Sequence, residues 1–81
     1  MSKQEIIDIV KVGAGLFGFE YNGKECHVDP YYDSKEQKSS YLLYCDGDET
    51  TVYSVDEVMS TAFFDGKSLN DIADKVIQVE Y

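Results

Sequence analysis

The Asn22-Gly23 dipeptide lies between two stretches in which apolar and polar residues alternate, and this pattern constrains the fold more than any other feature of the chain. Both residues tolerate the positive φ angles that a two-residue type I′ turn requires. A turn at this point pairs Phe19 with Cys26 and gathers the apolar side chains on one face of two strands. The sequence therefore predicts an antiparallel hairpin with one face in a hydrophobic core.

A second alternating region, residues 40–54, predicts another hairpin. A turn centred on residues 47–48 places Leu43 opposite Val52, whereas a turn centred one residue earlier places Leu43 opposite Thr50. We expect the first of these registers because it pairs two apolar side chains.

The segment between the hairpins, residues 29–39, holds the only proline of the chain, Pro30, followed by Tyr31, Tyr32 and a polar run of mixed charge. Proline and short polar residues are typical of turns and loops. We expect a surface loop here.

Three segments begin with a serine that is followed three residues later by an acid, a pattern in which each side chain can cap a free backbone N–H group. These pairs are Ser2 with Glu5, Ser54 with Glu57, and Ser68 with Asp71. Apolar residues recur at helical spacing after each pair: Ile6, Ile7, Ile9 and Val10 in the first segment, Val55, Val58, Met59, Ala62 and Phe63 in the second, and Leu69, Ile72, Ala73 and Val76 in the third. The pattern predicts three helices. Ile77, Val79 and Tyr81 also alternate, so the last residues either extend the third helix or form a short strand.

With 81 residues, of which 43% are hydrophobic, the chain is expected to form one domain, residues 1–81, of the α+β class. The predicted architecture is a small two-layer domain, with an antiparallel sheet of two hairpins (about four strands), an N-terminal helix and two C-terminal helices. No apolar run approaches the roughly 20 residues that span a bilayer, and the N-terminus lacks the pattern of a secretory signal. We therefore expect a cytoplasmic protein.

The chain carries sixteen acidic residues against seven lysines and no arginine, which gives a net charge of -9 at pH 7. Phosphate backbones repel such a chain, and arginine is the residue that binds phosphates and guanine edges in a bidentate way. We expect no direct binding to nucleic acid and none to anionic membrane surfaces. A basic protein partner is compatible with this charge.

A glycine-rich segment and two cysteines raise the question of cofactor binding and of metal or redox chemistry, and in both cases the surrounding sequence argues against it. The segment 13–18 matches the glycine pattern of dinucleotide-binding proteins, but that pattern needs a helix after the glycines, and here a strand and a turn follow. We therefore expect no cofactor. Cys26 and Cys45 do not form a Cys-x-x-Cys motif and alternate with apolar residues, so we expect buried free thiols.

His27, the only histidine, shares a strand face with Glu20 and Glu25 in the predicted hairpin. One imidazole and nearby carboxylates are possible ligands of a divalent metal. A solvent-facing strand of an acidic protein has the same composition, so we expect neither a metal site nor catalysis. A small metal-dependent enzyme built on His27 is the alternative from a different class.

Seven tyrosines and four phenylalanines are too many to be interior in so small a domain. We expect Phe17, Phe19 and Phe63 in the core. We expect partial exposure of Tyr31, Tyr32, Tyr41, Tyr44, Tyr53 and Tyr81.

Leu42, Tyr44 and Tyr53 share the outer face of the second hairpin, opposite Leu43, Cys45 and Val52. Tyrosine is enriched in protein interfaces. The hypothesis is a small acidic protein-binding or regulatory module, of inhibitor or adaptor type and not an enzyme, that uses these three residues. A homodimer is one possible assembly. The alternative in the same class is an acidic mimic of nucleic acid that blocks a DNA- or RNA-binding protein.

Overall fold

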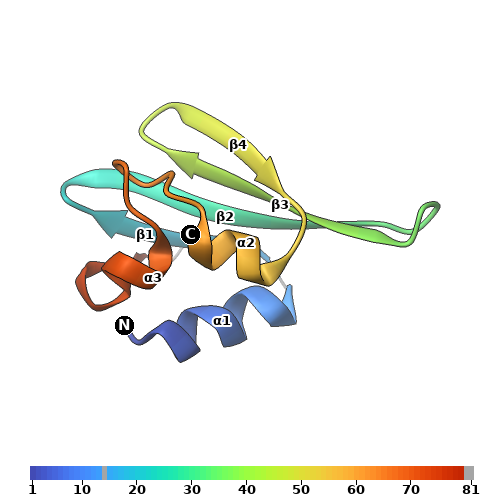
Figure 1. Cartoon of the computed structure of the whole chain (residues 1–81), viewed down its shortest axis with the longest axis horizontal. Coiled ribbons are helices and arrows are strands. Elements are labelled where there is room, and N and C mark those ends of the chain that lie inside the picture. Colours follow the sequence, from blue (N-terminus) through green and yellow to red (C-terminus); the bar gives the residue numbers. More distant parts are fainter. Residues whose placement is uncertain (14, 80–81) are drawn as a thin grey trace.

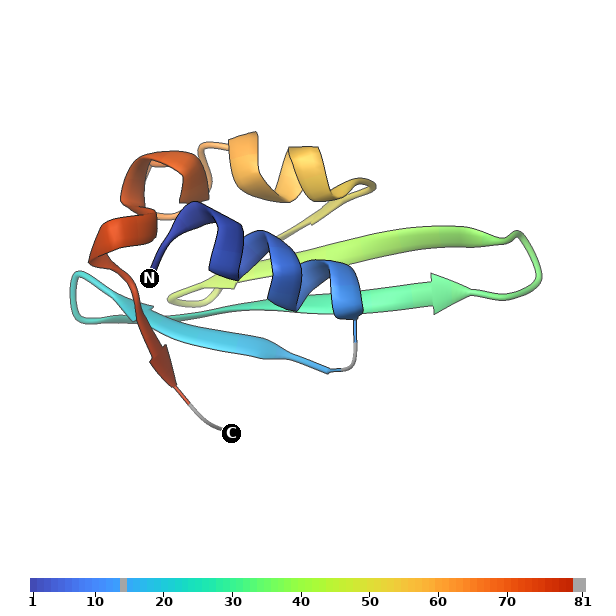
Figure 2. The ribbon, with the colours of Figure 1, turned by 90° about the horizontal axis from the view of Figure 1, so that it is seen from below.

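A five-stranded antiparallel sheet carries the helices on one of its faces in the computed structural model, which describes residues 1–13 and 15–79 (Figures 1 and 2). The strand order is β4-β3-β2-β1-β5. The strands are β1 (Phe17–Tyr21), β2 (Lys24–Asp33), β3 (Lys38–Cys45), β4 (Asp48–Val52) and β5 (Ile77–Val79). The helices are α1 (Lys3–Val12), α2 (Val55–Ser60) and α3 (Leu69–Ile72), and a 3₁₀ turn (Ala73–Lys75) follows α3. The α+β class of the predicted fold is confirmed, with one strand more than expected.

The first hairpin has the predicted register, with Phe19 opposite Cys26. Asn22 and Gly23 have φ angles of 53° and 75°, as a type I′ turn requires. The apolar residues of both strands therefore face the helices and are buried.

The expected loop at residues 29–39 is wrong, because β2 and β3 continue through it and close in a turn at residues 34–37. Pro30 lies within β2, opposite Tyr41. The Glu25 carbonyl accepts a hydrogen bond from the Asp46 N–H, so the even-numbered residues of β2 direct their backbone groups toward β1. Because β1 begins at Phe17, opposite Val28, no strand formed by the described residues lies beside Pro30 on that side, and its missing N–H breaks none of their ladder hydrogen bonds.

The expected register of the second hairpin is also wrong. Leu43 lies opposite Thr50, and Val52 lies opposite Tyr41. The turn falls on Asp46-Gly47, whose φ angles are 50° and 95°. An Asp-Gly pair suits a type I′ turn, and this local preference outweighs the pairing of Leu43 with Val52. The two registers differ by two residues, so each side chain keeps the face that the pattern predicted.

Serine caps begin all three helices as predicted, through Ser2, Ser54 and Ser68. The second helix is shorter than expected, because Thr61 adopts an extended conformation with φ -74° and ψ 123°. The chain then forms a tight turn at Asp65-Gly66 with an isolated bridge between Phe64 and Lys67.

The early end of α2 changes which phenylalanine is buried. Ala62 is exposed and Phe63 is only half-buried, whereas Phe64 is fully buried and packs edge-on against Phe19. The prediction that Phe63 belongs to the core is therefore wrong by one position. The final helical segment was predicted more accurately, since Leu69, Ile72, Ala73 and Val76 are all buried.

The ambiguity at the C-terminal end is resolved in favour of a strand. Residues Ile77–Val79 form β5, which pairs with β1 on the far side from β2. Tyr81, part of the same alternating pattern, lies outside the described residues.

The Asn22-Gly23 turn generates the first prediction. Replacing Gly23 with valine should lower the free energy of unfolding by about 1–3 kcal/mol, because valine is strained at a positive φ. Urea denaturation measures this change. Gly15→Val is the matched control, since a Cβ at either position meets open space but only Gly23 has a positive φ. Equal midpoints for the two variants would contradict the turn assignment.

The two neighbouring phenylalanines generate the second prediction. Phe64→Ala should cost about 3–5 kcal/mol of stability, because it leaves a cavity in the core. Phe63→Ala should cost clearly less, since its side chain already contacts solvent. Thermal melting of both variants tests this order, and a larger loss for Phe63→Ala would contradict the described packing.

Candidate binding surface

The face of the sheet opposite the helices is left uncovered by the described elements (Figure 2). We call it the outer face. The register of the ladder assigns to it the residues Glu20, Glu25, His27, Asp29, Tyr31, Asp33, Lys38, Ser40, Leu42, Tyr44, Glu49, Thr51, Ile77 and Val79, to which Leu16 adds its side chain just before β1. None of these side chains is among the buried core residues. The outer face is therefore a solvent-accessible sheet surface.

A stacked pair of rings lies at the middle of the outer face. His27 of β2 lies directly opposite Tyr44 of β3, with ring centroids 4.6 Å apart and planes within 8° of parallel. Both side chains are half-buried. Together with Leu16 and Glu25 they line a hollow with a volume of about 390 Å³. The stack provides a flat, rigid aromatic surface with polar edges, the kind of surface that proteins use at interfaces.

Exposed apolar side chains continue this surface toward β5. Leu16 is 41% exposed, Ile77 64% and Val79 38%. Ile77 lies opposite Glu20 and Val79 opposite Gly18, so both follow the parity of the outer face. Several apolar side chains on one uncovered sheet surface are a feature of interaction sites.

The charge of the outer face is negative. Glu20 lies opposite Glu25 across the β1–β2 ladder, and Asp29 and Glu49 add further carboxylates. Lys38, near the tip of the β2–β3 hairpin, is the one lysine that the register places on the described part of this face. The carboxylates of Glu20, Asp29 and Glu49 therefore outnumber the cations here and produce a negative potential that favours a cationic partner.

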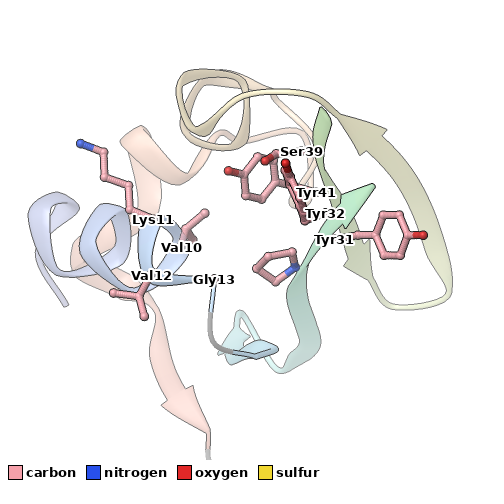
Figure 3. Close-up of a pocket in the computed structure, with 9 residues that line it drawn as sticks. Val10, Lys11, Val12, Gly13, Tyr31, Tyr32, Ser39 and Tyr41 are labelled. Carbon is pink, nitrogen blue, oxygen red and sulfur yellow. The ribbon is translucent and has the colours of Figure 1, made fainter. Parts of the chain in front are cut away.

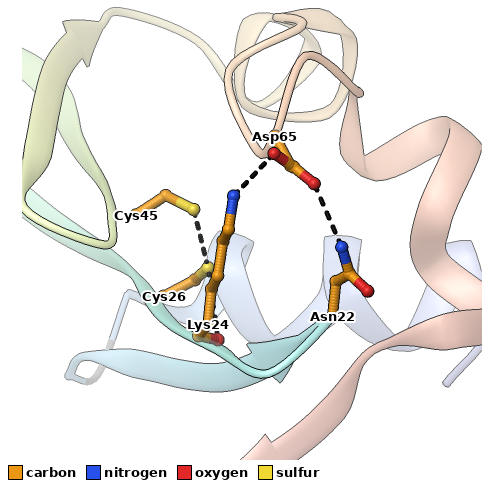
Figure 4. A network of polar contacts seen from close by, with 5 residues as sticks. All are labelled: Asn22, Lys24, Cys26, Cys45 and Asp65. Atoms are coloured by element: carbon orange, nitrogen blue, oxygen red, sulfur yellow. Dashed lines mark hydrogen bonds and ion pairs between the residues drawn. The ribbon is translucent and has the colours of Figure 1, made fainter.

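The nearest lysine, Lys24, is directed to the helix side of the sheet. Its Nζ contacts an oxygen of Asp65 at 2.6 Å, and the other carboxylate oxygen accepts from Asn22 at 3.2 Å (Figure 4). The hydrogen bond with Asp65 raises the pKa of Lys24, and the same contact lowers the pKa of Asp65. This network joins the β1–β2 turn to the turn before α3 and leaves the negative charge of the outer face unchanged.

The three residues predicted to bind a partner do not lie in one cluster. Leu42 and Tyr44 are neighbours on β3 and both are half-buried on the outer face. Tyr53, 67% exposed, lies just beyond the end of β4 and lines a separate hollow with Glu36, Lys38 and Ser39. Tyr53 thus belongs to the base of the protruding β2–β3 hairpin.

Sequence reasoning missed the contribution of His27 and Leu16 to this surface. The rung between His27 and Tyr44 exists because β2 pairs with β3, and the order of strands between hairpins was not predicted. The signal that could have revealed it is the presence of two β-prone residues, Tyr31 and Tyr32, directly after the first hairpin, which is compatible with a longer strand.

The residues considered for a metal site have a different environment. Glu20 and Glu25 face each other and His27 lies two rungs further along β2, stacked on Tyr44. Within residues 1–13 and 15–79, no group of three or more His, Cys, Asp or Glu side chains is arranged to hold a metal ion.

A third hollow, of about 200 Å³, lies on the helix side of the sheet between the C-terminal end of α1 and the β2–β3 hairpin (Figure 3). Tyr32 and Tyr41 lie together with Ser39 on one side of it, and Tyr31 points away. The expected partial exposure of tyrosines holds for Tyr31 and Tyr32, which are 64% and 60% exposed, and for the half-buried Tyr41. The sheet separates this hollow from the outer face.

No protein-family model, curated protein or solved structure matches this chain. Among the described residues, no helix has the length and apolar composition needed to cross a membrane.

The histidine generates a further prediction. Zn²⁺ or Mn²⁺ at micromolar concentration should leave the melting temperature unchanged, because a metal stabilises a protein only where it binds the folded state. Differential scanning calorimetry with and without metal measures this. A rise of several degrees that disappears in a His27→Ala variant would establish a metal site at His27, Glu20 and Glu25.

Proposed function

We propose that this chain is a small non-enzymatic protein-binding module of inhibitor or adaptor type, which acts in the cytoplasm and binds a partner with a basic surface through its outer face. The observation that carries the proposal is the uncovered sheet surface, where the His27–Tyr44 stack and exposed apolar side chains lie among carboxylates. Leu42 extends this surface along β3, beside Tyr44.

The combination of apolar centre and charged surroundings matches the anatomy of protein interfaces. Aromatic residues near the middle of an interface contribute most of the binding energy, and the polar rim excludes water. The stack is already formed in the free chain, so binding orders few side chains, which lowers the entropic cost of association. Leu16 and Ile77 supply further apolar area at the side of the stack.

The charge selects the class of partner. A partner that offers lysine or arginine opposite Glu20, Asp29 and Glu49 gains complementary charge and a faster encounter. Two copies of this chain that met through their outer faces would bring six of these carboxylates, three from each copy, into one interface. The same repulsion opposes nucleic acid and anionic lipid, so we favour a basic protein over a homodimer.

The acidic mimic of nucleic acid is the closest alternative, and salt separates it from the main proposal. A mimic binds by charge alone, so its affinity falls steeply as salt screens the carboxylates. Binding centred on the aromatic stack retains most of its affinity at high salt, since apolar burial is not screened. A strong loss of affinity with salt, together with no effect of Tyr44→Ala, would favour the mimic.

Tyrosine variants test the surface directly. The partner is captured from an extract of cells that make the protein, identified by mass spectrometry, and purified for titration. Tyr44→Ala should weaken association by about 1–3 kcal/mol, as the loss of an aromatic hot spot does. Tyr53→Ala should weaken it to a similar extent if the base of the hairpin also contacts the partner.

Tyr32→Ala is the matched control, since this tyrosine is exposed to a degree similar to Tyr53 but lies on the helix side. Each variant is melted as well as titrated, which separates lost binding from lost folding. A Tyr44→Ala variant that melts and binds like the wild type would refute the outer face as the binding surface.

A further inference from the structure

The two cysteines of the chain lie opposite each other in neighbouring strands. Cys26 of β2 pairs with Cys45 of β3, and their sulfur atoms are 3.1 Å apart (Figure 4). Both are buried and both are free thiols. The chain contains no third cysteine, so the other thiol is the only disulfide partner that each has within the molecule.

The hydrogen-bond pattern of the ladder explains why the two side chains meet. The Asp46 N–H donates to the Glu25 carbonyl at 3.1 Å, which marks Glu25 and Asp46 as a hydrogen-bonded pair. Because such pairs alternate along an antiparallel ladder, Cys26 and Cys45 form a non-hydrogen-bonded pair, whose Cα atoms lie about 4.5 Å apart. A disulfide bridges this separation. Bond formation therefore needs a small movement of the side chains and no change of register.

We propose that Cys26 and Cys45 are an oxidisable thiol pair that closes to an intramolecular disulfide in the presence of a low-molecular-weight disulfide such as oxidised glutathione. The proposal concerns the helix side of the sheet and does not rest on the function proposed for the outer face. In a cytosol kept reducing by glutathione the pair is a dithiol, and it closes when the small-thiol pool becomes oxidised.

The reaction takes place in two exchange steps. The Cys45 thiolate attacks one sulfur of the small disulfide, whose S–S bond breaks and releases one small thiolate. Cys26 then gives up its proton and attacks the Cys45 sulfur of the mixed disulfide, and the second small thiolate leaves and takes a proton. The two protein thiols are oxidised by two electrons, and the small disulfide is reduced to two thiols.

The environment of the two sulfurs sets the order of these steps. Cys26 is fully buried, whereas Cys45 is 5% exposed. Burial, reinforced by the hydrogen bond with Cys45, raises the pKa of the Cys26 thiol and keeps it protonated. Cys45 is therefore the thiol that attacks the small disulfide. Cys26, which is the more deeply buried of the two, then attacks the Cys45 sulfur and resolves the mixed disulfide.

The experiment equilibrates the folded chain with oxidised and reduced glutathione in mild urea, which increases local opening without unfolding the protein. The equilibrium is approached from the reduced chain and from chain oxidised in denaturant and refolded. In buffer dominated by oxidised glutathione, both samples should converge on a species lighter by two hydrogen atoms, without attached glutathione, as read by intact mass spectrometry. The oxidised chain should melt at a higher temperature than the reduced one, because the bond closes a loop between residues 19 positions apart.

Single-cysteine variants test the order of reaction. Cys26→Ala should accumulate one glutathione on Cys45, since the resolving thiol is absent, and Cys45→Ala should stay unmodified while folded. Convergence of both wild-type samples on the dithiol, attachment of glutathione to the wild type, or a lower melting temperature of the oxidised chain would each overturn the proposal.

Discussion

The pairing of β2 with β3 is the interaction on which the rest of the structure depends. It joins the two hairpins into one sheet and extends from Cys26–Cys45 at one end to Asp33–Lys38 at the other. Alternate residues of the same ladder serve different purposes: Val28 and Leu43 close the core under the helices, while His27 and Tyr44 form the ring stack on the outer face. Because side chains alternate along a strand, core and surface are fixed by a single register, and a slip by one residue would exchange them.

The sequence predicts correctly which face of the sheet each strand residue occupies, and it also predicts where the helices begin. The Asn-Gly turn fixed the first register, and the serine caps fixed where α1, α2 and α3 begin. Both signals are local, because turn and cap residues act on a backbone only a few positions away. The assignment of Leu42 and Tyr44 to the outer face followed from the same parity.

Features that depend on which strands are neighbours, or on packing between elements, could not be predicted from the sequence. Pro30 favours a loop when the sequence alone is considered. A proline is nevertheless compatible with a strand where no neighbouring strand needs its N–H, and among the described residues only the length of β1 reveals that Pro30 has no such neighbour. The end of α2 at Ser60 was missed because apolar residues at helical spacing continue to Phe63. The stack of His27 on Tyr44 requires knowledge of which strands are neighbours, and periodicity within one hairpin does not contain it.

The position of Pro30 also bears on how the chain avoids assembly through its strands. Beyond the start of β1, no strand of the described residues pairs with one side of β2. An unpaired edge offers N–H and C=O groups to which a strand of another molecule can pair. Pro30 has no N–H and directs its backbone toward this edge, so it removes a donor from the point where such pairing would begin. At the opposite border of the sheet, Asp48 and Glu49 place charge at the start of β4. The only proline of the chain thus lies where β2 loses its neighbour, and its missing N–H makes the addition of a foreign strand there less favourable.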